Sequence, residues 1–230
     1  MKIHGLQKLT LLDFPGQIAC TVFTAGCNMR CPFCHNASLV THIDPDEVMD
    51  DSDFFAFLKK RTGILDGVAI TGGEPTLVPD LIPFMEQIRS AGFKIKLDTN
   101  GTRPDILREI LDRKLADYVA MDIKNSKEKY AETIGIQGFN IQNIEKSAEM
   151  LLTSGLEFEF RTTVVDSLHS PSDFSSIGRW LPGNELYFLQ NFKDSGDLIV
   201  PGMTGKTPDQ MEECLLAIKQ YIPNAKLRGL

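Results

Sequence analysis

The sequence predicts an α/β fold in which parallel strands alternate with outer helices, as in a partial (β/α)6 TIM-like barrel. Short apolar segments alternate along the chain with longer segments of helical periodicity. Repeated strand–helix–strand connections make neighbouring strands parallel and place the helices outside the sheet. Eight such units close a full barrel of roughly 250 residues, so about six of them predict an open, partial barrel.

The predicted strands share a short apolar run that precedes a turn or a polar segment. They are residues 18–24, 68–71, 94–98, 118–123, 157–165 and 186–191. Five further segments repeat apolar residues three or four positions apart, which is typical of a helix with one buried face. They are residues 53–61, 81–90, 104–114, 141–154 and 207–221. Their ends support this interpretation, because Pro104 suits a first helical position, Thr207 suits a cap, and Gly155 follows a last turn.

Composition limits the class of protein. The 230 residues are 42% hydrophobic and 24% charged, which predicts one soluble domain over residues 1–230. The net charge of −7 argues against nucleic acid or an anionic membrane as the partner. No apolar run reaches the roughly 18–20 residues that span a bilayer, and no apolar signal core follows the N-terminus. We therefore expect a cytoplasmic protein.

The cysteines indicate metal chemistry. Three of the five cysteines, Cys27, Cys31 and Cys34, form a C-x3-C-x2-C pattern within eight residues. Three thiolates on one loop suit a [4Fe–4S] cubane, in which each binds one iron and the fourth iron stays open to a ligand. Cys20 and Cys214 lie inside a predicted strand and helix, where buried small side chains are expected. A zinc site completed by His35 or His42 is the alternative, although zinc ligands usually arrive in C-x2-C pairs.

Polar residues follow the predicted strands where each strand ends. Such side chains meet at one rim, since the carboxyl ends of parallel strands lie together. The candidates are Gly72, Gly73 and Glu74 after the second strand, Asp98, Thr99 and Asn100 after the third, Asp122 and Lys124 after the fourth, and Arg161 in the fifth. A plain ion pair with Glu159 is the alternative for Arg161.

The cysteine pattern with Phe33 before its last cysteine, together with the Gly-Gly-Glu-Pro segment at 72–75, resembles the radical S-adenosylmethionine (SAM) superfamily. In that superfamily the open iron chelates the methionine part of SAM, and reductive cleavage gives a 5′-deoxyadenosyl radical. The flanking segments 11–16, 22–27 and 34–36 resemble glycyl-radical-enzyme activating proteins. The resemblance is greatest to the anaerobic ribonucleoside-triphosphate reductase activating group, which is related to pyruvate formate-lyase activating enzyme.

This resemblance implies roles for the rim residues. Gly72 and Gly73 would bind the SAM amino group through backbone carbonyls, and Glu74 would support the loop or that amino group. Lys124 would pair with the SAM carboxylate, and Asp122 would hold Lys124 or a cation. The remaining implied SAM or cation contacts are Asp98 and Thr99 at a monovalent cation, Asn100 beside them, Arg161 at the carboxylate or ribose, and Phe33 near the adenine.

The resemblance also implies partners: a glycyl radical enzyme as substrate, with anaerobic ribonucleoside-triphosphate reductase first, and a flavodoxin or ferredoxin as electron donor. A radical SAM enzyme acting on a small 7-deazaguanine precursor is one alternative. That family usually has Asp-Thr after the motif, where this chain has His35-Asn36. A non-enzymatic iron–sulfur or zinc module is the other alternative, and it leaves the rim segments unexplained.

Overall fold

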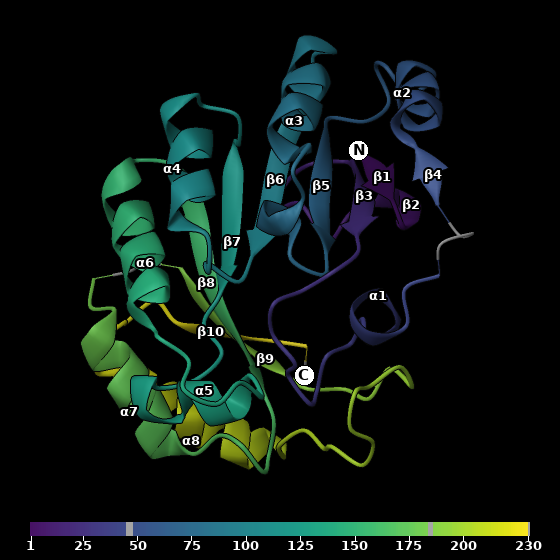
Figure 1. Ribbon diagram of the computed structural model, residues 1–230. Coiled ribbons are helices and arrows are strands. Elements are labelled where there is room, and N and C mark those ends of the chain that lie inside the picture. The colour runs from purple at the N-terminus through teal and green to yellow at the C-terminus, as the bar shows by residue number, and fades with distance from the viewer. Residues whose placement is uncertain (45–47, 184–185, 230) are drawn as a thin grey trace.

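The computed structural model describes residues 1–44, 48–183 and 186–229. Its main sheet has eight strands in the order β10-β9-β8-β7-β6-β5-β3-β2 (Figure 1). Their bounds are β2 (Gly5–Thr10), β3 (Ala19–Thr24), β5 (Gly67–Gly72), β6 (Lys94–Thr99), β7 (Tyr118–Asp122), β8 (Glu157–Val164), β9 (Tyr187–Asn191) and β10 (Lys226–Arg228). A small antiparallel pair joins β1 (Lys2–Ile3) to β4 (Met49–Asp50).

The six predicted strands are present as β3, β5, β6, β7, β8 and β9, and all six run parallel. Two edge strands extend the sheet beyond the prediction: β10 pairs parallel with β9, and β2 pairs antiparallel with β3. Within the described part of the chain, β2 and β10 each pair with a single strand. The sheet is therefore open, as a partial barrel requires.

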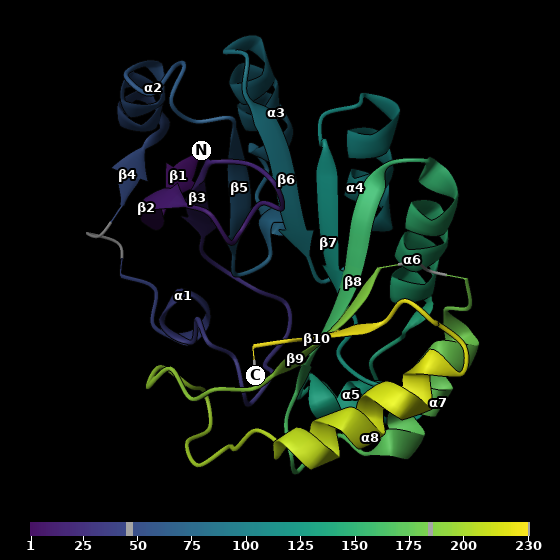
Figure 2. The ribbon, with the colours of Figure 1, turned by 180° about the vertical axis from the view of Figure 1, so that it is seen from behind.

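Helices follow most of the parallel strands. They are α1 (Ser38–Thr41), α2 (Asp51–Lys59), α3 (Leu81–Ser90), α4 (Pro104–Asp112), α5 (Tyr130–Thr133), α6 (Gln142–Ser154), α7 (Pro171–Trp180) and α8 (Pro208–Lys219). Helices α3, α4 and α6 cover the outer face of the sheet, which is turned to the viewer in Figure 1. From behind, the strands lie in front of these helices (Figure 2). None of the described helices is both long and apolar enough to cross a bilayer.

Helix α7 was not predicted, although its start carries a readable signal. Ser170 and Asp173 form a capping box around Pro171, which stands at the first helical position. Phe174 and Ile177 are buried, and α7 packs against α8. The interior Gly178 weakens the helical pattern in the sequence. Its missing Cβ has a packing reason, because a Cβ there would lie 2.9 Å from Tyr221 Cβ.

The two faces of the sheet differ in chemistry. Outward side chains such as Val22, Ile70 and Leu97 are fully buried against the helices. One row of inward side chains crosses four strands at Thr21, Ala69, Lys96 and Tyr118. The inner face is therefore partly polar and leads to the carboxyl ends of the strands. Cys20 and Cys214 are 0% exposed within the apolar core, which confirms the prediction for them.

Candidate active site

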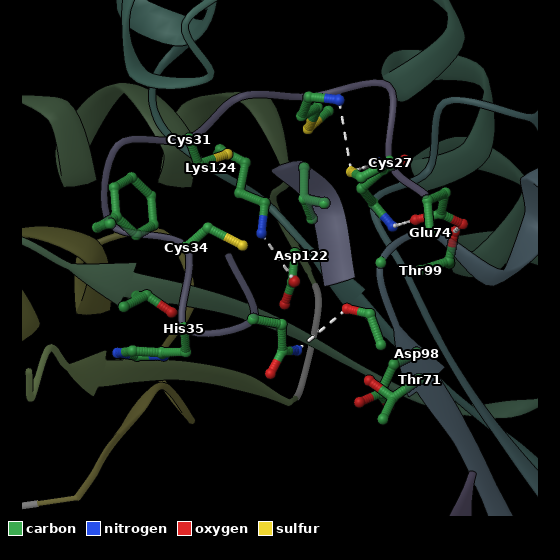
Figure 3. Close-up of a pocket in the computed structure, with 18 of the residues that line it drawn as sticks. Cys27, Cys31, Cys34, His35, Thr71, Glu74, Asp98, Thr99, Asp122 and Lys124 are labelled. Carbon is green, nitrogen blue, oxygen red and sulfur yellow. Dashed lines mark hydrogen bonds and ion pairs between the residues drawn. The ribbon is translucent and has the colours of Figure 1, made fainter. Parts of the chain in front are cut away.

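A cavity of about 240 Å³ lies at the carboxyl ends of the parallel strands (Figure 3). Every site residue predicted from the sequence lies in its wall. The lining residues are Cys27, Met29, Cys31, Phe33, Cys34, His35, Asn36, Val40, Thr71, Gly72, Gly73, Glu74, Asp98, Thr99, Asn100, Asp122, Lys124, Arg161, Thr163 and Gln190. Sequence reasoning assigned no role to Met29, Val40 or Thr163. Thr163 follows Arg161 by two positions, so strand periodicity alone places it on the same face.

The three predicted cluster ligands surround one side of this cavity. Burial raises the pKa of the Cys31 thiol to about 12 and also raises the pKa of Cys27, while the positive charge of Lys124 acts against both increases. Across the described residues, no three His, Cys, Asp or Glu side chains are grouped to hold one metal ion. Three thiols that line one cavity suit a cubane, which takes each thiolate on a different iron. The donor set fits that group.

The two histidines of the zinc alternative are engaged elsewhere. His35 Nε2 lies 2.8 Å from the carbonyl oxygen of Lys193, and its ring stacks on Phe192 with centroids 5.1 Å apart. His42 Nδ1 lies 2.8 Å from Thr41 Oγ1. The geometry therefore does not support a zinc site completed by either histidine. His35 instead joins the cysteine loop to the segment that follows β9.

The glycines at the end of β5 let two backbone segments touch. The amide of Gly73 donates to Thr24 O and the amide of Glu74 donates to Gly26 O, each at 2.8 Å. A Cβ on Gly73 would lie 2.1 Å from Gly26 O, and one on Gly72 would lie 2.3 Å from Thr24 O. The segment that leads into the cysteine loop therefore fills the space that the missing side chains leave.

Glu74 connects the ends of β5 and β6. Its carboxylate is 1% exposed and accepts hydrogen bonds from Thr99 Oγ1 at 2.7 Å and from the Asn100 amide at 2.6 Å. Thr76 donates to it as well, from its amide and its hydroxyl. Burial raises the pKa of Glu74, and these hydrogen bonds act in the opposite direction. Of the two roles implied for Glu74, the observed contacts match support of the loop.

Asn100 joins the end of β6 to the cysteine loop. Its Nδ2 lies 3.0 Å from Asn28 Oδ1 and 3.8 Å from Cys27 Sγ. Its Oδ1 accepts from the amide and the hydroxyl of Thr102. The side chain thus fixes the turn after β6 and presents an N–H group to a predicted cluster ligand.

A row of alternating charges, called the charge ladder here, lines the cavity with four of its five members and ends at a buried lysine below it. It comprises Lys124, Asp122, Arg161, Asp98 and Lys96 in that order. Lys124 Nζ lies 2.9 Å from Asp122 Oδ2, and Arg161 Nε lies 2.5 Å from Asp122 Oδ1. Arg161 Nη2 lies 2.9 Å from Asp98 Oδ2, and Asp98 also forms an ion pair with Lys96. The ladder joins strands β6, β7 and β8.

The ladder sets the ionisation of its members. Burial favours the neutral form of Asp122, but Arg161 and Lys124 outweigh burial and hold the pKa of Asp122 well below its usual range. Burial likewise disfavours charged Lys124, yet Asp122 raises the pKa of Lys124 above its usual value. Both groups therefore stay charged at neutral pH. The predicted alternative pairing of Arg161 with Glu159 is not observed, because Glu159 accepts two hydrogen bonds from Arg228, at 2.8 and 2.9 Å.

His169 supports the cavity from behind. It is 3% exposed. Its Nδ1 accepts from the Val165 amide at 3.1 Å, which leaves the ring proton on Nε2 to donate to the Lys124 carbonyl at 2.8 Å. Burial lowers the pKa of His169, so the ring is neutral near pH 7. His169 thereby fixes the backbone at Lys124.

Comparisons with known proteins agree with this site. The sequence pattern of the Radical SAM superfamily matches residues 21–169. A candidate glycyl-radical enzyme activating enzyme of Methanocaldococcus jannaschii is 31% identical over 238 residues, which cover 99% of this chain and 96% of that protein. The pyruvate formate-lyase-activating enzyme of Listeria monocytogenes is 33% identical over 134 residues, about half of each chain.

The fold has a solved counterpart. A radical SAM methyltransferase from Sphaerobacter thermophilus superposes with a TM-score of 0.74 at 14% identity, covering 96% of this chain and 68% of that one. The chain belongs to the radical SAM superfamily. Within it, the chain is a homologue of the glycyl-radical-enzyme activating enzymes. Membership in this superfamily implies a [4Fe–4S] cluster and SAM as cofactors.

Proposed function

We propose that this protein is a glycyl-radical-enzyme activating enzyme and that its partner is anaerobic ribonucleoside-triphosphate reductase. One observation carries the activity: three thiols on a single loop face a cavity that is also lined by four members of the charge ladder. The choice of partner rests on the resemblance of the segments that flank the cysteines. A flavodoxin or ferredoxin in the cytoplasm would supply the electron. When bound, the cluster and SAM supply a carbon-centred radical that abstracts hydrogen from a glycine.

The cysteine loop provides the ligands. Cys27, Cys31 and Cys34 would each bind one iron, which leaves the fourth iron to SAM. Lys124 would assist iron binding by these cysteines, because its positive charge opposes the rise in the pKa values of Cys27 and Cys31. Fixed positive charge favours the thiolate forms that metal binding requires.

The cavity wall offers complementary groups for SAM. Lys124 and Arg161 would bind the methionine carboxylate, since both stay charged in a place with little water. The backbone carbonyls of Gly72 and Gly73 would accept from the amino group, and Phe33 would pack near the adenine. Phe33 is 4% exposed and contacts His169 edge to face, with centroids 6.5 Å apart, so its ring position is fixed.

Electron paramagnetic resonance tests this proposal directly. The protein is reconstituted anaerobically with iron and sulfide, then mixed with SAM, a reductant and the reductase. We expect a glycyl radical signal on the reductase, and we expect Cys31→Ala in this chain to abolish it. Replacing the radical-bearing glycine of the reductase by alanine is the matched control on the partner.

The same experiment separates the alternatives. A glycyl radical on pyruvate formate-lyase but not on the reductase would keep the activity and change the partner. Turnover of a small 7-deazaguanine precursor without any protein partner, and no glycyl radical on either enzyme, would contradict the proposal.

A further inference from the structure

Lys96 is a buried lysine for which the proposed chemistry has no role. It lies in β6 with 3% of its side chain exposed, on the inner face of the sheet. It precedes Asp98 by two positions on the same strand, so it lies about 7 Å further from the carboxyl end of that strand. No role was predicted for it from the sequence.

A buried ammonium group needs a partner, because an unpaired charge in the interior is costly. Lys96 forms an ion pair with Asp98, which also binds Arg161. Asp122 in turn lies between Arg161 and Lys124. Each carboxylate of the ladder is therefore placed between two cations. With three cations and two carboxylates, the ladder carries one net positive charge without any bound ion.

The resemblance noted above implied a monovalent cation at Asp98 and Thr99, and the residues present do not fit one. Both oxygens of Asp98 are paired with cationic side chains. Thr99 Oγ1 donates to Glu74 at 2.7 Å and accepts from the Gly101 amide at 3.1 Å. A further cation would add a second net positive charge to the ladder, whose members are largely shielded from water.

We propose that Lys96 is a built-in counter-ion: its ammonium group supplies, as part of the chain, the positive charge that an alkali cation would supply. Lys96 acts on the site through Asp98, which in turn holds Arg161 in the cavity wall. It is a positioning residue, and it makes the site independent of sodium and potassium. The proposal concerns charges within this chain, so it stands apart from the identity of the protein partner.

Thermal unfolding of the protein without cluster or SAM provides the first test. The melting temperature is compared in sodium, potassium and tetramethylammonium chloride at equal ionic strength. We expect the unaltered protein to melt at the same temperature in all three. Lys96→Ala leaves room beside Asp98, so its melting temperature should be lower in tetramethylammonium and rise saturably with sodium or potassium. Lys96→Arg should keep the independence, because it keeps the charge.

Lys94→Ala is the matched control. Lys94 is an exposed lysine on the same strand, and its Nζ lies 3.1 Å from Gln17 Oε1. This variant should show no dependence on the cation. If the melting temperature of the unaltered protein depends on sodium or potassium, the proposal is overturned, and that measurement needs no variant to fold. A Lys96→Ala protein that small cations fail to restore would overturn it as well.

SAM affinity provides the second test. In cluster-loaded Lys96→Ala, we expect the dissociation constant of SAM to rise about tenfold in tetramethylammonium, as for a loosened buried ion pair. Sodium or potassium should restore most of the lost affinity for SAM. The unfolding test requires neither cluster, SAM nor partner. Its result for Lys96 can therefore be interpreted even if the proposed function is wrong. An equal loss of affinity in all three salts would contradict the built-in counter-ion.

Discussion

At the scale of single residues, the site depends on buried charges that are compensated rather than removed. Asp98 and Asp122 have pKa values below their usual range despite burial, because cations flank each of them. Glu74 has no such cation among the contacts described, and its pKa is raised by burial. The same cavity wall thus holds carboxylates shifted in opposite directions, and the position of each relative to the charge ladder explains the difference.

The lowered pKa of Asp122 predicts how stability depends on pH. A carboxylate with a depressed folded pKa stabilises the fold above its unfolded value of about 3.9, and this contribution is lost as pH falls through the folded value. Asp122→Asn should therefore reduce the free energy of unfolding at neutral pH and make its decline in acid shallower. Urea unfolding of the cluster-free protein between neutral and acid pH measures both effects.

The exposed Asp112, at the end of α4, serves as the comparison. Asp112→Asn should leave the acid decline almost unchanged. An identical decline in the Asp122→Asn and Asp112→Asn proteins would show that the ladder does not hold the Asp122 carboxylate in its charged form.

At the scale of elements, the cysteine loop is positioned by its contact with the end of β5. Backbone hydrogen bonds join Gly73 to Thr24 and Glu74 to Gly26. Asn36 Nδ2 adds a further bond to the carbonyl of Gly72, at 3.1 Å. The contact requires glycine at position 73 on steric grounds, and Gly72 has in addition a φ of +117. The two motifs that define the site in the sequence are therefore one structural unit.

Gly73→Ala tests this contact. The new Cβ would lie 2.1 Å from Gly26 O, so the two segments must separate. We expect the free energy of unfolding to fall by more than about 2 kcal/mol and the cluster content after reconstitution to fall with it. Chemical denaturation and iron analysis provide the two readouts.

Gly63→Ala separates steric conflict from backbone strain. Gly63 has φ +79 and no neighbour within 4 Å of a Cβ, so the strain alone should cost about 1 kcal/mol. The Gly63→Ala protein should keep a normal cluster content after reconstitution. Equal iron loss in both glycine variants would mean that the cysteine loop does not depend on the β5 contact.

At the scale of the whole molecule, the sequence predicted the parallel strands and the location of the site but not the edges of the sheet. The outward side chains of the central strands are apolar because helices cover them, and that pattern is visible in the sequence. Strand β2 is exposed over Gln7, Lys8 and Leu9, and β10 has three residues, so neither has a strong pattern of its own. Their pairing depends on contacts between distant parts of the chain.

The same distinction explains which site residues can be predicted from the sequence. The cysteines, the glycines and Lys124 belong to local motifs at strand ends. Lys96 belongs to no motif, and its partner Asp98 is in turn bound by Arg161 on β8, two strands away in the sheet. Only the assembled inner face shows that Lys96 is buried and paired.

Reductive cleavage of SAM by this chain alone tests the central claim most directly. Cluster-loaded protein is reduced anaerobically with SAM and without a partner, and 5′-deoxyadenosine and methionine are measured. The account predicts equal amounts of both products, none from Cys27→Ala, Cys31→Ala or Cys34→Ala, and normal amounts from Cys214→Ala, which removes a buried thiol outside the cavity wall. Intact SAM in the unaltered protein, or normal cleavage by any of the three loop variants, would contradict it.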